Sequence, residues 1–364
     1  MSGLSTTRLA MKRIIAAAIL STSLMTAIKA AGDQSPAPES QLCTTWAGPA
    51  FAILDRVSLI YHGTRYPGVT LVSLSTGTIS GRIPISKPIL SATVLSTKGQ
   101  LILAIAGDGG INIDRYDTTT LQLLESRTFA GLEATLAIFT PNGANLVGVT
   151  RSDRLFKIDT VGSAAPAMAA TVTGISSLAM SPKGDIVYLA GDGILTIGLD
   201  NLAEIKSAWR ERYFIDVDVN PNGHTLAMRS TDNLGEVSYY DAATLAFIKS
   251  SIVDAAASPT ALAASLLHFS RDGSALYYIQ RRSNGRSAGL VELNADSMAV
   301  RGSLNGDFFA PPLDDGQGTA WALRGATGSG HDELLAVDNQ SLSIKRNLPI
   351  LDRVNAVDAT GCQH

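Results

Sequence analysis

A short turn sequence that ends in glycine recurs along this 364-residue chain, and its spacing limits what the chain can fold into. Typical copies are Ser181-Pro182-Lys183-Gly184 and Asn220-Pro221-Asn222-Gly223, and the last copy is degenerate. The six glycines are Gly99, Gly143, Gly184, Gly223, Gly273 and Gly316. The intervals between them are 44, 41, 39, 50 and 43 residues. Self-similarity at such a period indicates one repeated supersecondary unit rather than several unrelated domains.

Each repeat reads as four short β-strands. An apolar segment leads into the turn, and a segment rich in β-branched and aromatic residues follows it, as in Ile186-Val187-Tyr188-Leu189. A third apolar segment then ends at an acidic or polar residue. These residues are Asp117, Asp159, Asp200, Asp241, Asn294 and Asp338. Four strands in a unit of roughly 40 residues are typical of a propeller blade. The chain is therefore predicted to be an all-β protein, a β-propeller.

The number of blades depends on the two ends of the chain. Residues 57–77 match a unit without the motif glycine, and residues 354–361 match a first strand with its turn, ending at Gly361. We therefore predict seven blades, with the ring closed by exchange of a strand between the termini. Six or eight blades stay possible, because residues 43–56 form either a complete strand or only a lead-in.

The Ser-Pro-x-Gly turn, the Tyr/Val strand and the later Asp resemble the YVTN-type, WD40-like propeller repeat, over about residues 50–361. The resemblance implies the fold and does not select an activity, because relatives of this type include cell-envelope proteins, lactonases and propeller subunits of amine dehydrogenases. The chain has no Cys-x-x-Cys-His sequence, so electron transfer through haem is not supported. No cofactor and no metal site is predicted.

The N-terminal residues predict export. Lys12 and Arg13 precede a mostly apolar run over 14–25, which leads to small residues around Ala30. This order is typical of a secretory signal peptide, and the run is too short to span a bilayer. We predict a signal peptide over 1–30 with cleavage near Ala30, a flexible tether over 31–42 and the propeller over 43–364. The mature protein would be periplasmic or secreted, without a membrane span.

Charge and cysteine content agree with an exported protein. The formal charge is −3, and removal of residues 1–30 takes away four cations and no anions, which leaves −7. An acidic surface offers no electrostatic basis for binding nucleic acid, and we expect a monomer. Cys43 and Cys362 lie near the two ends and are predicted to form a disulfide that fastens the closed ring. Two unrelated thiols are the alternative.

Loops that follow the second strands open on one rim of a propeller, where ligand sites are commonly found. Arginine forks suit carboxylate or phosphate groups, and ordinary solvated charges are the alternative. Trp209 and Phe308, on connections between blades, are a candidate aromatic lip, although blade packing explains them as well. The candidate rim residues for ligand binding are Arg65, Arg281, Arg282, Arg286, Arg324 and His331.

A second candidate site lies at the central channel. Five residues before the motif glycine most units have an apolar residue, but two neighbouring units have Asp218 and His268. Asp216 faces the same way as Asp218 because strand residues alternate between faces. These three are candidate catalytic residues, as an acid–base or ion-binding group. Structural pairing inside the ring is the alternative.

No assembled catalytic motif was found in the sequence. The favoured prediction is therefore an exported, non-enzymatic propeller scaffold that binds a protein partner or a small ligand of the cell envelope on its loop rim. The alternative is a propeller hydrolase or lactonase-like enzyme with a site at the central channel.

Overall fold

The computed structural model describes residues 50–52, 69–73, 79–85, 87, 89–95, 98–233, 235–253, 267–281, 287–308, 312–314, 318–325 and 332–350. These residues form twenty-five β-strands in six antiparallel sheets. The prediction of an all-β protein is confirmed.

The sheets follow the order of the chain. The first contains β1 (Ala50–Ala52), β2 (Val69–Ser73) and β3 (Ile79–Ile83). The second contains β4 (Ile89–Leu95), β5 (Gln100–Gly107), β6 (Gly110–Asp117) and β7 (Leu123–Ala130). The third contains β8 (Ala134–Phe139), β9 (Asn145–Thr150), β10 (Arg154–Asp159) and β11 (Ala167–Thr171).

The remaining strands form one six-stranded and two four-stranded sheets. The six-stranded sheet contains β12 (Ser177–Met180), β13 (Ile186–Gly198), β14 (Ala203–Val219), β15 (Thr225–Ser230), β16 (Glu236–Asp241) and β17 (Phe247–Ile252). The next contains β18 (Leu267–Phe269), β19 (Ala275–Arg281), β20 (Ser287–Asn294) and β21 (Val300–Asn305). The last contains β22 (Leu313–Asp314), β23 (Thr319–Arg324), β24 (Asp332–Asp338) and β25 (Ile344–Ile350).

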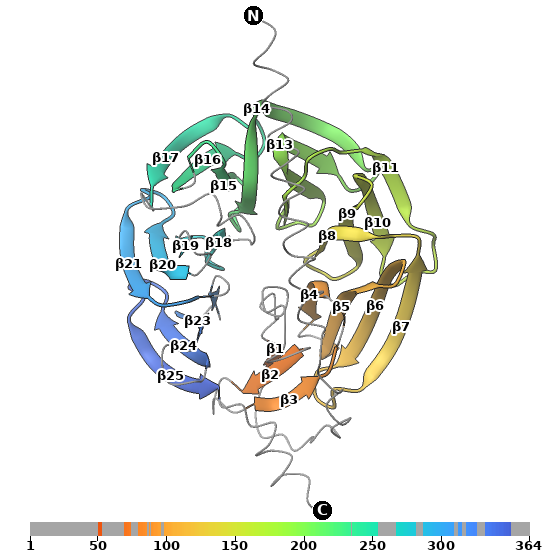
Figure 1. Cartoon of the computed structure of the whole chain (residues 1–364), viewed down its shortest axis with the longest axis horizontal. Helices are drawn as coiled ribbons and strands as arrows, with labels where there is room; N and C mark the ends of the chain where they lie inside the picture. Colours follow the sequence, from red (N-terminus) through yellow and green to blue (C-terminus); the bar gives the residue numbers. More distant parts are fainter. Residues whose placement is uncertain are drawn as a thin grey trace, which may run out of the picture.

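The sheets are arranged radially around a common centre, with the chain passing from one to the next around a ring (Figure 1). The first strand of a sheet lies innermost, so β4 contacts β8, β8 contacts β12, and the end of β14 contacts β18. The last strand lies at the circumference, as β7, β17, β21 and β25 do. This arrangement is that of a β-propeller.

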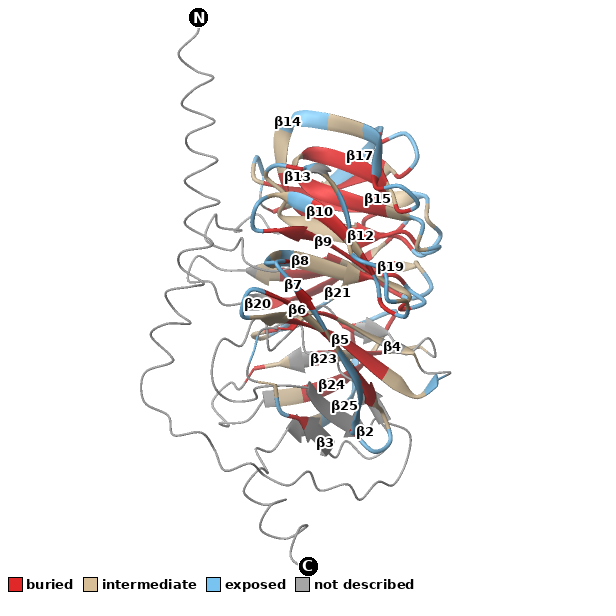
Figure 2. Cartoon of the chain, turned by 90° about the vertical axis from the view of Figure 1, so that its right-hand side faces the viewer, coloured by how far each residue is buried: buried red, intermediate tan, exposed pale blue. Residues whose placement is uncertain are grey.

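The core lies between neighbouring sheets, at interfaces that we call seams. Ile102 and Ile113 of the second sheet pack with Leu146 and Phe156 of the third, and all four side chains are buried. Buried residues concentrate in the middle strands, whereas much of the outer part of β14 is exposed (Figure 2). Each sheet therefore needs a neighbour on both faces to remove its apolar side chains from water.

The repeated turns form as the sequence predicts. Gly99, Gly143, Gly184, Gly223 and Gly273 all have positive φ angles, between 58° and 77°. Four of these glycines donate their N–H to the carbonyl three residues earlier, as Gly184 does to Ser181 at 2.9 Å. A positive φ is accessible to glycine without steric cost, which explains why glycine marks each turn. Gly316 and Gly361 lie outside the described residues.

The six-stranded sheet contains two long strands. In β13 the chain folds back on itself, because the N–H of Leu199 donates to the carbonyl of Asp185 at 2.8 Å. Ala203 to Ala208 of β14 pair with β13, and Phe214 to Val219 pair with β15. The two halves pack on each other, as neighbouring sheets do elsewhere, with Ala190 and Ile194 in one core cluster with Phe214.

This geometry corrects one prediction from the sequence. Leu199 makes the hydrogen bond that the residue after the strand end makes in other sheets, as Thr160 does to Ala144. The third strand of this repeat therefore ends at Gly198, and Asp200 is an exposed residue of the following turn. The acidic residue misled the prediction because Asp200 lies within the turn, where the side chain of Asn201 accepts the N–H of Ala203 at 3.0 Å.

Several predicted features lie outside the described residues. They are the signal peptide, the tether, Cys43, Cys362 and the closing strand over 354–361. Within the part of the chain that the structure describes, no helix is long and apolar enough to cross a membrane.

Candidate functional site

The structure brings Asp218 and His268 together beside the centre of the ring. Asp218 is near the end of β14 and His268 is the middle residue of β18. Their Oδ2 and Nδ1 atoms are 3.3 Å apart, and the side chains are 21% and 43% exposed. If Nδ1 carries the proton and donates to Asp218, Nε2 is left to accept a proton. The pair thus has the geometry of an oriented imidazole, although its catalytic role stays a prediction.

Asp218 has a second partner. Its Oδ2 accepts the main-chain N–H of Phe269 at 2.7 Å. Phe269 follows His268 on β18, so a single carboxylate holds both the side chain and the backbone of this short strand. Such a charge-assisted bond positions β18 against β14 across a seam.

Asp216 also holds β18 in place, and it is more deeply buried than Asp218. Its side chain is buried, and its Oδ2 accepts the N–H of Leu267 at 3.0 Å. Its Oδ1 accepts the N–H of Val217 at 3.0 Å and the hydroxyl of Ser177 at 3.2 Å. Asp216 therefore links three inner strands, β12, β14 and β18. Three donors satisfy this buried carboxyl group, which supports a structural role for it.

On the predicted rim, Arg324 is held within its own sheet. The Nε of Arg324 donates to Oε2 of Glu333 at 2.9 Å, and Asn347 donates to the other oxygen at 3.2 Å. Burial by itself would raise the pKa of Glu333, but these hydrogen bonds and the Arg324 charge lower it overall. Arg324 thus ties β23 to β24, with Asn347 adding β25 to the same cluster.

Of the other predicted rim residues, the structure describes only Arg281. Arg281 is the last residue of β19. Arg65, Arg282, Arg286 and His331 lie outside the described residues. The structure therefore neither assembles nor separates the predicted arginine patch.

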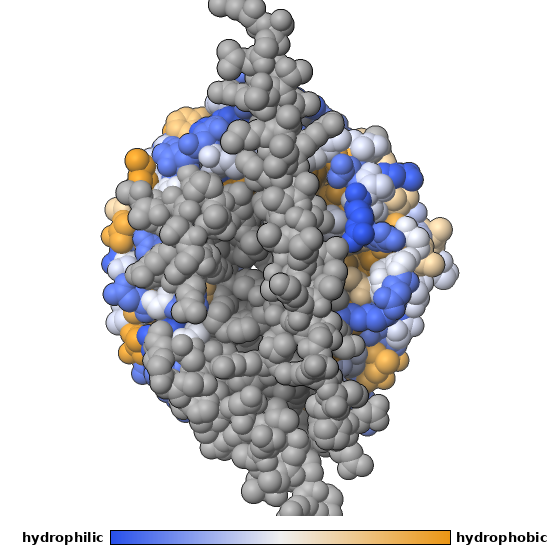
Figure 3. Space-filling model, in the orientation of Figure 1, coloured by the Kyte–Doolittle hydropathy of each residue, from blue (hydrophilic) through white to orange (hydrophobic). Residues whose placement is uncertain are grey.

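Ion pairs recur on the same rim. Lys87 and Asp108 are 3.1 Å apart, Arg151 and Glu133 are 3.9 Å apart, and Arg212 and Asp232 are 3.0 Å apart. In the first two pairs, one residue lies just before the first strand of a sheet and the other in the hairpin between its second and third strands, whereas Arg212 lies within β14 and Asp232 in the β15–β16 hairpin. In the view of Figure 3, hydrophilic residues gather over the β4–β7 and β8–β11 sheets. Exposed pairs of this kind add little stability.

The two residues of the candidate aromatic lip differ in exposure. Phe308 is completely buried, in one core cluster with Leu335 and Val337 of the last sheet, so the alternative of blade packing holds for this residue. Trp209 is 39% exposed and lies edge-on to Tyr240, at 5.5 Å between ring centres. Phe308 packs between sheets because burial of a large apolar ring lowers the free energy of the folded state.

Sequence reasoning missed a set of charged residues inside the seams. Arg115 is buried, and its Nη2 donates to the carbonyl of Thr160 in the next sheet at 2.8 Å. Lys157 donates in the same way to the carbonyl of Leu199. Both residues lie two positions before the end of a third strand, where an ionisable residue interrupts an apolar pattern. That interruption is the signal that could have identified them.

Among the residues that the structure describes, no group of three or more His, Cys, Asp or Glu side chains is placed to hold a metal ion. The channel group is therefore best described as one carboxylate–imidazole pair next to one structural carboxylate.

Comparison with known proteins identifies the fold. No protein-family model matches the chain, and no curated protein matches its sequence. A solved structure that it resembles is the β-propeller domain of Myceliophteria thermophila Cps50 (Swd1), with a TM-score of 0.57 and 12% sequence identity. The match covers 75% of this chain and 90% of that domain, which is a WD40 β-propeller. At this identity the likeness concerns architecture alone, and it agrees with the radial sheets: the chain has a β-propeller fold.

Proposed function

We propose that this chain is an exported, non-enzymatic propeller of the YVTN type that binds a protein partner or a small ligand of the cell envelope on its loop rim. The observation that carries the proposal is the use of Asp216 and Asp218. These carboxylates, which an enzyme at the channel would need, accept the main-chain N–H groups of Leu267 and Phe269. Because these carboxyl groups position β18, they favour the interpretation of the chain as a scaffold over that of a catalytic site.

We further propose that the ring has seven blades. The six-stranded sheet divides into two units of four if the two arms of β13 and the two halves of β14 are counted separately. Its halves pack through Ala190 and Phe214 as neighbouring sheets do. With the four four-stranded sheets and β1–β3, this makes seven units. Residues 354–361 would then complete the β1–β3 unit, and a Cys43–Cys362 disulfide would hold the two ends together.

Ring closure has a direct test. The mature protein, expressed with export to an oxidising compartment, should show a mass two hydrogens below that of the reduced protein. Removal of residues 351–364 should lower the unfolding midpoint, because β1–β3 would lose its fourth strand. A Cys43→Ser, Cys362→Ser double variant serves as the control that breaks only the disulfide. Two free thiols with an unchanged midpoint on truncation would contradict this closure.

The rim is proposed as the binding surface because its hairpins carry exposed charges of both signs. Asp108 and Arg151 belong to hairpins of neighbouring sheets, and each has its ion-pair partner at the entry to its own sheet. Alternating charges fit the polar surface of a protein better than they fit a single small anion. The arginines of the β19–β20 and β23–β24 connections would suit a carboxylate or phosphate group on the ligand.

The test of binding combines capture with a footprint. Tagged mature protein would be used to isolate partners from the compartment in which it is found, and hydrogen exchange would map the surface that each partner protects. We expect protection of the rim hairpins and weaker binding by an Arg281→Ala, Arg282→Ala variant. Lys206→Ala, an exposed change on the outer part of β14, is the matched control. Protection of the circumference instead of the rim would overturn the assignment.

An enzyme at the channel is kept as a second candidate because of one observation, the partly exposed His268 beside Asp218. In a lactonase-like reaction, Asp218 would act as base or ion ligand and His268 would move the proton. Purified protein would be assayed against lactones and esters with and without divalent metal. Activity that survives in both Asp218→Asn and His268→Gln would exclude these roles.

A further inference from the structure

Two seams of the ring are closed by a cation that reaches a particular carbonyl. Arg115 donates to the carbonyl of Thr160, and Lys157 donates to that of Leu199. Thr160 and Leu199 occupy equivalent places, because each donates its own N–H to the carbonyl just after a motif turn, at 2.9 and 2.8 Å. The third strand therefore supplies a donor to the same acceptor at both seams.

Glu292 occupies this position in β20. It lies two residues before Asn294, where the strand ends, and its side chain is completely buried. The equivalent carbonyl in the last sheet is that of Asn339, because the N–H of Asn339 donates to Gly318 at 3.3 Å. An ionised carboxylate can only accept hydrogen bonds. Glu292 therefore places an acceptor at the strand position where Arg115 and Lys157 place a donor.

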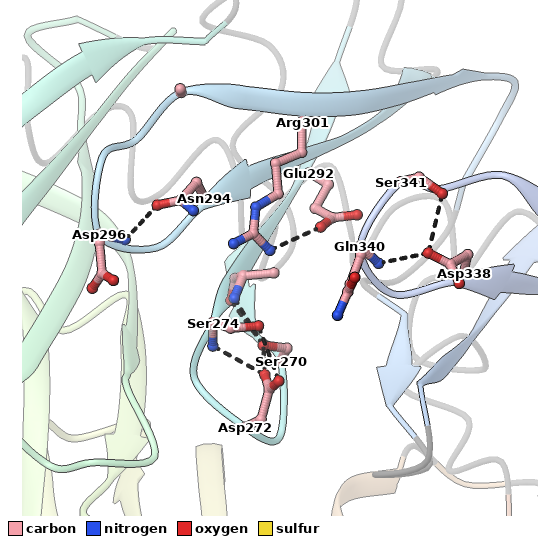
Figure 4. Close-up of polar contacts among 12 residues, drawn as sticks. Ser270, Asp272, Ser274, Glu292, Asn294, Asp296, Arg301, Asp338, Gln340 and Ser341 are labelled. Carbon is pink, nitrogen blue, oxygen red and sulfur yellow. Dashed lines mark hydrogen bonds and ion pairs between the residues drawn. The ribbon is translucent and has the colours of Figure 1, made fainter.

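The surroundings of Glu292 do not satisfy an anion. Its Oε1 lies 3.5 Å from Nη1 of Arg301, at the limit of a hydrogen bond. Its Oε2 has no hydrogen-bond partner among the residues that the structure describes. Figure 4 shows the carboxyl group between Arg301 and the turn that begins at Asp338. An unpaired carboxylate oxygen in such a site is costly to keep charged.

The charged and titratable groups around Glu292 come from each neighbouring element. Arg301 on β21 favours its anion, whereas Asp338 on β24 and Asp272 in the turn before β19 disfavour it. Lys345 on β25 lies 3.0 Å from Asp338 and offsets part of that charge. The cross-strand neighbour on β19 is Tyr277. One cation at the limit of contact therefore faces two carboxylates.

We propose that Glu292 is a proton-operated latch at the seam between the β18–β21 and β22–β25 sheets. The neutral carboxyl donates its Oε2 hydrogen to the carbonyl of Asn339 and closes the seam, as Arg115 and Lys157 do elsewhere. Loss of the proton leaves two acceptors face to face and loosens the contact between the sheets. The ring would then open most readily at this seam when the pH rises.

The direction of the pH effect follows from the folded environment. Burial raises the pKa of Glu292 from 4.5 to about 7, against the opposing charge and hydrogen bond of Arg301. The folded protein therefore binds an extra proton between these two values. Its stability is greatest at the acidic end of this window, falls as pH rises to about 7, and is then level. Hydrogen bonds from Thr120 and Thr244 lower the pKa of the turn residues Asp117 and Asp241, whereas burial raises the pKa of Asp153, so the contribution of Glu292 is isolated by comparing wild type with E292Q.

The experiment compares thermal unfolding of the full chain from pH 5.5 to 8.5. Glu292→Gln supplies a permanent N–H donor of nearly the same shape, and Glu204→Gln removes an exposed carboxylate paired with Arg210 as the matched control. We expect E292Q to unfold about 4 °C above wild type at pH 8, with the difference disappearing toward pH 5.5. E204Q should follow the wild-type profile. Identical pH slopes for wild type and E292Q would overturn the proposal.

A second measurement does not depend on the variant folding. Infrared spectra of wild-type protein with isotope-labelled glutamate should show a protonated buried carboxyl at pH 6 that is lost around pH 7. Hydrogen exchange, corrected for intrinsic rate, should show lower protection at Asn339 above that pH. A carboxylate that is already ionised at pH 6 would exclude the latch.

Discussion

Two seams of this ring each bury a carboxylate, and the two carboxylates differ in the number of donors that meet them. Asp216, at the seam between β14 and β18, accepts hydrogen bonds from Leu267, Val217 and Ser177. Glu292, at the seam between β20 and the last sheet, has one contact at 3.5 Å. The comparison teaches that burial alone does not set the role of an acid. An acid with enough donors serves as a fixed structural link, and the acid with too few is the one for which we propose a response to pH.

The largest effect is expected at the well-satisfied seam. Asp216→Ala leaves the N–H of Leu267 and the hydroxyl of Ser177 without their acceptor, and removes the cross-strand neighbour of the buried Arg229. We expect a loss of about 3 kcal/mol in the free energy of unfolding, measured with urea. Asp200→Ala, in an exposed turn, is the control. A loss below about 1 kcal/mol would show that Asp216 does not hold β18 in place.

The next largest effect is expected at the seam of Glu292, when its neighbouring cation Arg301 is removed. Arg301→Gln removes the one cation close to Glu292, so the pKa of Glu292 should rise further and its pH window should extend upward. At pH 8 the variant should lose about 1–2 kcal/mol, and less at pH 5.5 where Glu292 is neutral. Arg210→Gln, on an exposed pair, is the control. A loss that is the same at both pH values would mean that Arg301 acts independently of Glu292.

The seam at which Lys157 donates to the carbonyl of Leu199 should behave differently from the seams of Asp216 and Glu292. Lys157→Met keeps much of the apolar stem and removes the bond to Leu199, so we expect a loss of about 1 kcal/mol. Because no carboxyl group takes part in this bond, we expect the same loss at pH 5.5 and at pH 8.5. Urea unfolding at the two ends of this range tests it. A strong pH dependence would erase the distinction between Lys157 and Glu292.

The smallest effect is expected on the rim. Lys87→Ala breaks the contact to Asp108, whose side chain is 99% exposed. Screening by water and salt makes such a pair nearly neutral for stability, so no measurable change in the unfolding midpoint is expected. A clear loss of stability would mean that the rim pairs hold the ring together and are not free for a partner.

The repeat made much of this architecture predictable. The turns at Gly143, Gly184 and Gly223 depend on a local backbone preference, so they could be read from the sequence and have the expected positive φ. The pairing of Asp218 with His268 was also foreseeable, because equal phase in neighbouring units places equivalent residues side by side. At these positions the structure reproduces what the local backbone conformation and the repeat predicted.

Other features could not be read in this way. The burial of Phe308 and the pairing of Arg324 with Glu333 depend on which sheet surface faces them. The shift from Asp200 to Gly198 depends on a hairpin whose register is set by its neighbours. A residue type shows which interactions a side chain can make, but its partners come from segments distant in sequence and are known only from the tertiary structure.

The sequence by itself determined a β-propeller, because a turn that only glycine adopts easily, repeated about every 40 residues, sets both the length and the phase of each unit. The tertiary structure decided the role of each buried charge. Asp216 and Glu292 carry the same chemical group, and only the packing of neighbouring sheets determines how many N–H and O–H groups reach it. Hydrogen bonding is short-ranged and directional. The number of donors around each carboxyl group therefore depends on the contacts between sheets and not on its neighbours in the sequence.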